Sequence, residues 1–119
     1  MNLINLTNHP YSLWDDLQKK DAEQYEKVID YPFPNVKAQT DEKHISALAD
    51  NVYKDVINKF GSNITIHLMG EFTLCYALLK RFQRSNIHCI ASCTERNVTE
   101  NADGEKIVRF EFKRFRHYE

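Results

Sequence analysis

Three groups of polar residues have side chains that could do chemistry, and each group follows an apolar stretch about as long as a strand. They are Asn8 with His9, residues 70–73 and residues 94–96, which follow residues 3–6, 64–69 and 88–92. In parallel α/β sheets, ligands bind at the carboxyl ends of the strands. We therefore expect one functional site at that edge. How close the three groups come depends on the strand order, which the sequence leaves open.

His9 is the most suggestive of these residues, because an imidazole exchanges a proton near neutral pH. The alternative is a loop histidine that is hydrogen-bonded to its own turn. Two other histidines, His67 and His88, fall within apolar stretches and are interpreted as structural. His44 and His117 are expected to be exposed.

The segment Gly70-Glu71-Phe72-Thr73 should open a helix directly after a strand. The free backbone N–H groups at such a helix start can hold a phosphate, and Gly70 would let the ligand approach. Glu71 would repel a phosphate unless it holds a hydroxyl. The alternative is that Gly70 only makes a tight turn and Glu71 only complements the helix dipole. Neither a GxGxxG fingerprint nor a P-loop occurs, which argues against dinucleotide cofactors and ATP hydrolysis.

Arg96 is the best candidate for an electrostatic partner, because a guanidinium matches phosphate oxygens in a bidentate fork. It could equally be solvated, or paired with Glu95 or Glu100. We expect no metal, since Cys89 and Cys93 would lie roughly 13 Å apart on an extended strand. A serine hydrolase is poorly supported, because no G-x-S-x-G motif is present.

The composition is that of one soluble globular domain. The chain has 119 residues, 42% of them hydrophobic and 28% charged. Its net charge of -1 argues against binding long nucleic acid. Three cysteines without the spacing of a disulfide framework favour a reducing, cytoplasmic setting. No apolar run approaches the length of a membrane span, so we expect no membrane association.

Hydrophobic periodicity predicts three α/β units followed by an antiparallel hairpin, that is, a mostly parallel sheet flanked by helices. Strands are expected at residues 3–6, 27–30, 64–69 and 88–92. Helices are expected from Ser12, as the cap, to about Tyr25, from Asp41, as the cap, towards Gly61, and from residue 71 to Arg84, with Cys75, Leu78, Leu79 and Phe82 facing inward. Asp103-Gly104 signals the hairpin turn, and an apolar register slip between Phe112 and Phe115 suggests a bulge.

Several of these segments together resemble small CRISPR-associated Csx-type proteins of type III systems, which have a CARF-like (Rossmann-like) fold. The segments are Asn8-His9, Gly70-Glu71, Thr94-Glu95-Arg96-Asn97-Val98 and the ending from Phe112 to Tyr118. The match is strongest over residues 91–98 and the last strand. It departs at Cys93, where a Thr is usual.

This resemblance implies a single CARF-like domain over residues 1–119 that binds cyclic oligoadenylate as a homodimer, with tetra-adenylate as the expected ring. It implies a ring nuclease in which a ribose 2'-OH attacks the neighbouring phosphate, without metal or cofactor, leaving linear products with 2',3'-cyclic phosphate. The alternative is a sensor or sponge that binds the ring without cleaving it. The expected catalytic residues are His9, Glu71 and Arg96, and the expected ligand-binding residues are Asn8, Ser12, Gly70, Phe72, Thr73 and Thr94.

Overall fold

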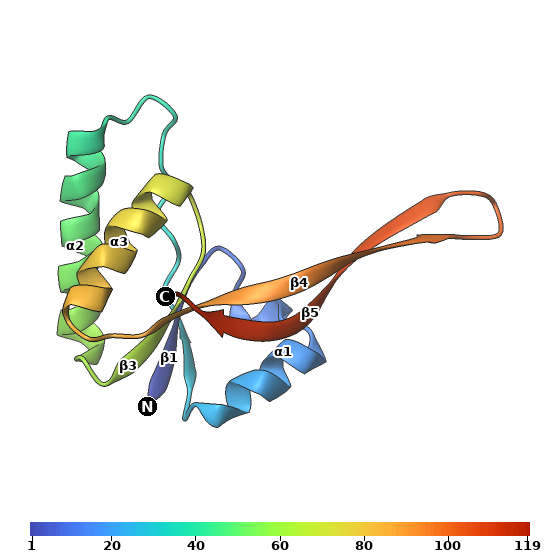
Figure 1. Ribbon diagram of the computed structural model, residues 1–119, viewed down its shortest axis with the longest axis horizontal. Helices are drawn as coiled ribbons and strands as arrows, with labels where there is room; N and C mark the ends of the chain where they lie inside the picture. Colours follow the sequence, from blue (N-terminus) through green and yellow to red (C-terminus); the bar gives the residue numbers. More distant parts are fainter.

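The computed structural model describes the whole chain, residues 1–119, as an α/β domain with a five-stranded sheet (Figure 1). The strand order is β2-β1-β3-β4-β5, parallel except for β5, which pairs antiparallel with β4. The strands are β1 (Asn2–Leu6), β2 (Val28–Asp30), β3 (Ile64–Leu68), β4 (Cys89–Glu100) and β5 (Lys106–His117), and the helices are α1 (Asp16–Asp21), α2 (Glu42–Phe60) and α3 (Phe72–Arg84). The predicted fold class is thus confirmed at the level of a mostly parallel sheet with helices and a C-terminal hairpin.

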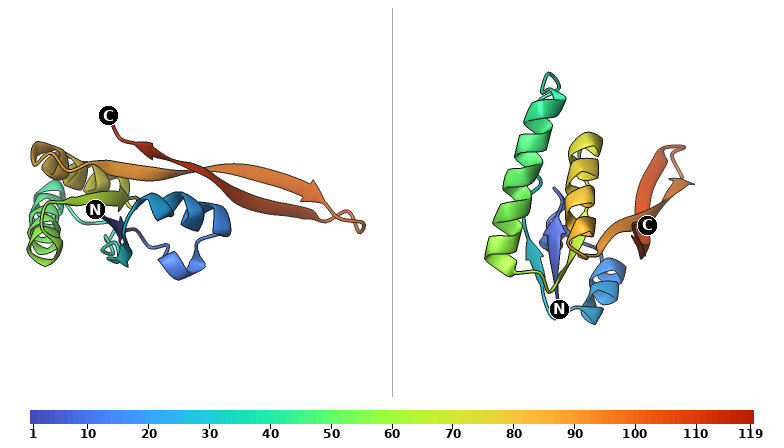
Figure 2. Two further views of the ribbon diagram at one scale, coloured as in Figure 1. Left: turned by 90° about the horizontal axis from the view of Figure 1, so that it is seen from below. Right: turned by 60° about the vertical axis from the view of Figure 1, so that its left-hand side comes forward.

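One face of the sheet is covered by α2 and α3, which pack against each other and bury an apolar cluster of 15 residues (Figure 2). We call this group, with Ile4, Ile66 and Phe82 at its centre, the α2/α3 cluster. The predicted cap of α2 is confirmed, because the Asp41 carboxylate accepts a hydrogen bond from the backbone N–H of His44. Of the side chains expected to face inward from α3, Leu78 and Phe82 do so.

The other two inward predictions for α3 were only partly right. Cys75 and Leu79 are half-buried, and the third fully buried position of the helix is Leu74. Leu74, Leu78 and Phe82 follow a spacing of four residues, which keeps them on one helical stripe. The stripe is therefore rotated by a fraction of a turn from the predicted one.

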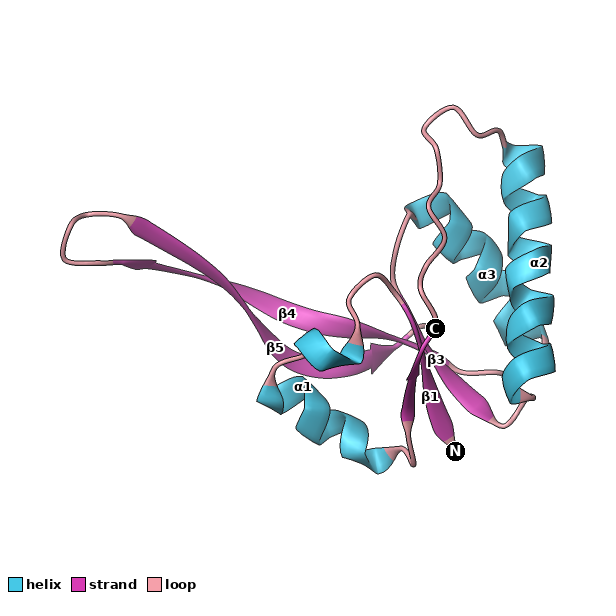
Figure 3. Cartoon of the chain, turned by 180° about the vertical axis from the view of Figure 1, so that it is seen from behind, coloured by secondary structure: helices cyan, strands magenta, loops and turns pink.

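The opposite face carries a thinner layer made of α1 and two 3-10 turns, Tyr11–Leu13 and Ala22–Gln24 (Figure 3). The prediction of one helix capped by Ser12 was wrong. Asp15 caps α1 instead, because its carboxylate accepts the Gln18 N–H at 2.8 Å. Leu17 is exposed, whereas Trp14 is buried. We call the six buried apolar residues of this face, Trp14 among them, the α1 cluster.

The largest difference from prediction lies in β4. A polar loop was expected from residue 93 to 96, but the strand continues to Glu100 without a break. β5 pairs with it beyond the predicted hairpin arm, so the backbone groups of residues 94–96 are also satisfied by a ladder that the local sequence does not reveal. The two strands form a long ribbon that extends beyond the helices (Figure 2).

The turn and the bulge of this ribbon were predicted correctly. Gly104 adopts a positive φ of 79° in the turn, a conformation that favours glycine. The register shifts at Cys93/Thr94, where the partner changes from Arg114 to Phe112. This bulge keeps Phe112 and Phe115 on the same face of the sheet.

Two smaller predictions concern the ends of elements. His88 was placed within a strand, but it is exposed and precedes β4, whereas His44 and His117 are exposed as expected.

None of the helices combines the length and the apolar character needed to cross a membrane.

Candidate functional site

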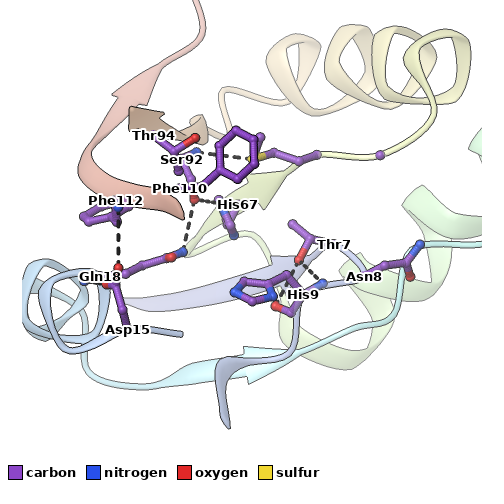
Figure 4. A pocket seen from close by; sticks show the side chains of 12 residues that line it. Thr7, Asn8, His9, Asp15, Gln18, His67, Ser92, Thr94, Phe110 and Phe112 are labelled. Atoms are coloured by element: carbon purple, nitrogen blue, oxygen red, sulfur yellow. Dashed lines mark hydrogen bonds between the residues drawn. The ribbon is translucent and has the colours of Figure 1, made fainter. Parts of the chain in front are cut away.

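A pocket of about 530 Å³ lies at the carboxyl ends of β1 and β3 and beside the first half of β4, between the α1 layer and the root of the hairpin (Figure 4). This is the edge at which the sequence predicts a site. Four of the predicted residues line it: Asn8, His9, Gly70 and Thr94. Asn8 and His9 come from the segment after β1, Gly70 from the segment after β3, and Thr94 from within β4.

The remaining predicted residues, Ser12, Glu71, Phe72, Thr73 and Arg96, do not line the pocket. Ser12 is exposed in the first 3-10 turn. Phe72 is 89% exposed at the start of α3. The structure therefore divides the predicted set into a group that converges and a group that stays outside the pocket.

Glu71 explains why the start of α3 is a poor phosphate site. Its carboxylate accepts the backbone N–H groups of Thr73, at 3.0 Å, and Leu74, at 2.9 Å, and also the Thr73 hydroxyl. These hydrogen bonds hold the pKa of Glu71 below its usual range. The helix N-terminus is therefore already occupied by an anion of the chain itself, which agrees with the alternative in which Glu71 complements the helix dipole.

Gly70 is needed for packing as well as for the turn. A Cβ atom at this position would lie 2.6 Å from the ring of Phe33, which is buried in the α2/α3 cluster. The backbone at Gly70 can therefore lie against Phe33 and still border the pocket.

Arg96 lies beyond the pocket along the hairpin. It pairs with Phe110, just as Thr94 pairs with Phe112, so all four side chains are on the same face of the ribbon. Phe110 and Phe112 line the pocket, and Phe110 is nevertheless 66% exposed. Arg96 thus stands next to the mouth of the pocket, on the surface that continues its wall.

A row of hydrogen-bonded polar side chains crosses four adjacent strands, and two of its members, His67 and Ser92, line the pocket. The Asn5 amide donates to Asp30 Oδ1 at 2.9 Å, and Asn5 Oδ1 lies 2.8 Å from His67 Nδ1. His67 Nε2 lies 2.6 Å from Ser92 Oγ. We call Asp30, Asn5, His67 and Ser92 the polar row.

The hydrogen bonds at Asn5 decide the tautomer of His67. The Asn5 amide nitrogen faces two acceptors, Asp30 Oδ1 and the His9 carbonyl, so its carbonyl oxygen must face His67. His67 Nδ1 must then carry the proton, and neutral Nε2 is the acceptor. It follows that the Ser92 hydroxyl donates to His67.

His67 is kept neutral by its surroundings. The side chain is only 2% exposed, and the rings of Trp14 and Phe115 lie against it at 5.3 and 5.4 Å between centroids. Burial, with a smaller effect from the charge of His9, lowers the pKa of His67 to about 4. At neutral pH the imidazole is therefore a free base whose Nε2 points to a single hydroxyl.

α1 contributes two polar groups to the same site. Gln18 Nε2 donates to Ser92 Oγ at 3.1 Å, and Gln18 is itself buried. Asp15 accepts the Gln18 N–H with one carboxylate oxygen and the Phe112 N–H, at 3.4 Å, with the other. The cap of α1 thus ties the helix to β5 and holds Gln18 over Ser92 (Figure 4).

The chemistry available in the pocket is that of hydroxyl, amide and imidazole groups. No Lys or Arg lines it, and Asp15 is its one carboxylate. His, Cys, Asp and Glu side chains do not gather in threes anywhere in the structure in a way that could hold a metal ion. The site is suited to proton transfer and hydrogen bonding rather than to strong electrostatic capture.

Sequence reasoning missed the polar row. His67 was interpreted as structural, and Ser92, Gln18, Asn5 and Asp30 were not considered. A signal did exist, because Asn5 and His67 are polar residues near the carboxyl ends of two short strands, and Ser92 lies on the same face of the next strand. Recognising it requires the pairing register between strands, which is not a local property of the sequence.

The comparisons with known proteins give one match. No curated protein sequence matches the chain. A family model with the description "Uncharacterized protein MJ1673 family" matches residues 1–116, almost the whole length. The chain therefore belongs to the MJ1673 family.

Proposed function

We propose that this protein is a CARF-like, Rossmann-like ring nuclease that binds cyclic oligoadenylate, with the tetra-adenylate as first candidate, and cleaves it without a metal. The observation that supports this best is the convergence of Asn8, His9 and Thr94 on one pocket at the carboxyl ends of β1 and β3 and beside β4. In this proposal the protein acts in the cytoplasm and switches off type III CRISPR signalling.

The cleavage step needs a ribose 2'-OH, the adjacent phosphorus and the leaving 5'-oxygen in line. His9 takes the proton of the attacking hydroxyl or gives one to the leaving oxygen. Asn8 and Thr94 donate hydrogen bonds to ribose or phosphate. Arg96, next to the pocket mouth on the Thr94 face, approaches the phosphate oxygens as negative charge builds up on them.

A ring of several nucleotides exceeds one pocket of about 530 Å³, so the proposal requires two copies of the chain. A symmetric dimer would present two identical pockets to a symmetric ring. The hairpin offers a contact surface, because Val98, Val108 and Phe110 are exposed and share one face. That face is continuous with the pocket wall at Phe110, so pairing there would bring the two pockets together.

The test is incubation with cyclic tri-, tetra- and hexa-adenylate in the presence of EDTA, followed by separation of the products. Linear fragments ending in 2',3'-cyclic phosphate are expected. Arg96→Ala and His9→Ala should each lower the rate, whereas Arg84→Ala, a matched change of an exposed arginine remote from the pocket, should not. Cleavage that is untouched by Arg96→Ala would exclude the assigned role of that residue.

A second candidate, a sensor or sponge that binds the ring without cleaving it, is favoured by one observation. The pocket lining has no Lys or Arg, and Glu71 blocks the start of α3, so the added charge of a cleavage transition state has few partners within one chain. Incubation with an excess of cyclic oligoadenylate over protein distinguishes the two functions. A sponge returns the ring intact and saturates at a fixed stoichiometry, whereas a nuclease turns it over.

A further inference from the structure

Ser92 is the last member of the polar row, and it lines the pocket. Its Oγ is 2.6 Å from His67 Nε2, and His67 Nδ1 is 2.8 Å from Asn5 Oδ1. Serine, histidine and asparagine thus form a hydroxyl, a base and a group that orients the base. That order of contacts is the structural signature of an activated nucleophile.

Each hydrogen bond between Ser92, His67 and Asn5 is held in place by neighbouring groups of the fold. Asn5 cannot turn its amide, because Asp30 and the His9 carbonyl both require its N–H groups. Thr7 also donates its hydroxyl to Asn5 Oδ1 at 2.9 Å, which reinforces the acceptor that faces His67. The imidazole cannot rotate away, because it is enclosed by Trp14 and Phe115.

We propose that Ser92 is a nucleophile, activated by His67 and oriented through Asn5, that attacks the carbonyl carbon of an ester bound in the pocket. An uncharged ester fits a pocket whose lining has no Lys or Arg. Met69, Phe110 and Phe112 provide an apolar wall for its acyl group. The serine lies half-buried within β4 rather than at a sharp strand-to-helix turn, which is why the search for a G-x-S-x-G motif did not find it.

The reaction balances with groups already in the site and water. As Ser92 Oγ bonds to the carbonyl carbon, its proton passes to His67 Nε2. The C–O bond to the alcohol then breaks, and His67 returns the proton to the leaving alkoxide. Water attacks the acyl-serine by the same route, giving up a proton to His67, which passes it to Ser92 as the carboxylic acid leaves.

Gln18 completes the arrangement as the donor nearest to the reacting atoms. Its Nε2 lies 3.1 Å from Ser92 Oγ in the resting state. After attack, the oxyanion stands on the carbon next to that oxygen, within reach of the same amide. Gln18 is buried and held by its place in the first turn of α1, so this donor is positioned before a substrate binds.

A fluorophosphonate probe tests the proposal with a readout that does not involve cyclic nucleotides. If Ser92 is activated, its Oγ forms a P–O bond, the P–F bond breaks and fluoride leaves. Peptide mass spectrometry of the intact wild-type protein should then locate a single adduct on Ser92. Ser92→Ala should abolish the adduct, and Ser62→Ala, an exposed serine in the loop before β3, should leave it unchanged.

His67→Gln measures the role of the base, because glutamine keeps hydrogen-bonding capacity but cannot take the proton. The rate of adduct formation should fall roughly 100-fold or more, the scale of general-base assistance. Hydrolysis of p-nitrophenyl acetate should fall in parallel, and thermal melting checks that the variant is folded. The mapping on wild-type protein decides the matter even if a variant fails to fold.

No adduct on Ser92, or labelling of Ser92 no faster than of Ser62, would overturn the proposal and leave the polar row as a satisfied buried network. The result is independent of the proposed ring nuclease. If the wild-type protein forms the Ser92 adduct but does not cleave the ring, only the nuclease proposal is rejected. If Ser92→Ala still cleaves the ring, ring cleavage by the ribose hydroxyl needs no protein nucleophile.

Discussion

The two faces of the sheet differ in the residues that they bury and in the helices that cover them. The face under α2 and α3 buries a cluster of 15 residues, all apolar, whereas the face under α1 buries six apolar residues together with Asn5, Thr7, Gln18, Thr65 and His67. The first face is covered by helices of 19 and 13 residues and the second by a helix of six. The longer helices close their face completely, and the short helix leaves the carboxyl ends of the strands open.

The difference shows how one sheet can provide both stability and a site. Apolar burial gives the larger and less demanding stabilisation, since it has no directional requirement. A buried polar row stabilises only if every member finds a partner, and then it also fixes orientation. The thin face thus gives up hydrophobic area and gains a histidine of defined tautomer next to an open pocket.

Removal of an aromatic side chain from the α2/α3 cluster, on the closed face of the sheet, should have the largest effect on stability. Phe82 is fully buried beneath α2 and contacts Tyr53, so Phe82→Ala leaves a cavity and should lower the free energy of unfolding by about 3–5 kcal/mol. Urea denaturation measures this. The matched change Phe110→Ala, on the exposed hairpin, should stay within about 0.5 kcal/mol, and equal losses at both positions would remove the contrast between the regions.

The face under α1 should make the free energy of unfolding depend on pH, because it buries His67. In the unfolded chain His67 takes up a proton near pH 6.5, but in the folded protein only near pH 4. Between these values the unfolded chain binds more protons, so stability falls as the pH falls, by about 3 kcal/mol over the window. The other titratable group that acts on His67 is His9.

Denaturation of wild type and His67→Gln at pH 7, 5.5 and 4 measures this effect, and NMR titration of the His67 ring gives its pKa directly. The variant should lose the part of the pH dependence that comes from His67. Parallel curves for the two proteins would show that the imidazole titrates equally in the folded and unfolded states.

Asn5→Ala should have an intermediate effect. It leaves Asp30 without its amide donor and His67 Nδ1 without an acceptor, and an unpaired buried group costs about 1–3 kcal/mol. Thermal and urea unfolding give the value, with the exposed Asn63→Ala as control. Equal stability of Asn5→Ala and wild type would mean that the polar row contributes no net stability and serves orientation alone.

The smallest effect is expected at the ion pair that joins the two helices of the closed face. Arg81 Nε lies 2.7 Å from Asp50 Oδ1, on the solvent side of α2 and α3. Because the pair is near the surface and screened by solvent, Asp50→Ala should lower the free energy of unfolding less than any of the changes above except the two controls. Arg81 retains its bond to the Ala77 carbonyl at 2.8 Å. A loss approaching that of Phe82→Ala would show that the helices are held by charge rather than by apolar packing.

Local signals in the sequence predicted much of the closed face. The spacing from Ile45 to Val56 gave α2, Asp41 gave its start, and the apolar run from Ile64 gave β3, because periodicity and capping depend on neighbouring residues. The hairpin turn at Gly104 and the bulge before Phe115 were also found, since each leaves a local mark.

The site was harder to predict, because it depends on distant pairings. Thr94 to Arg96 looked like a loop before the hairpin, since only pairing with β5 shows that one strand runs through these residues. His67 looked structural, since only the positions of Asn5 and Ser92 on neighbouring strands give it a direction. Asn8 and His9 were placed correctly because the end of a short parallel strand is itself a strong positional signal.

The position of β5 at the edge of the sheet has a consequence for how the protein is made. Phe112 and Phe115, near the end of the chain, close over a site whose other groups come from β1, β3 and α1. On the ribosome, β5 emerges after β1, β3 and α1, so His67 and Asn5 stay open to water until β5 pairs with β4. During that interval, a chaperone that binds apolar surface would find the uncovered Trp14 side of the sheet.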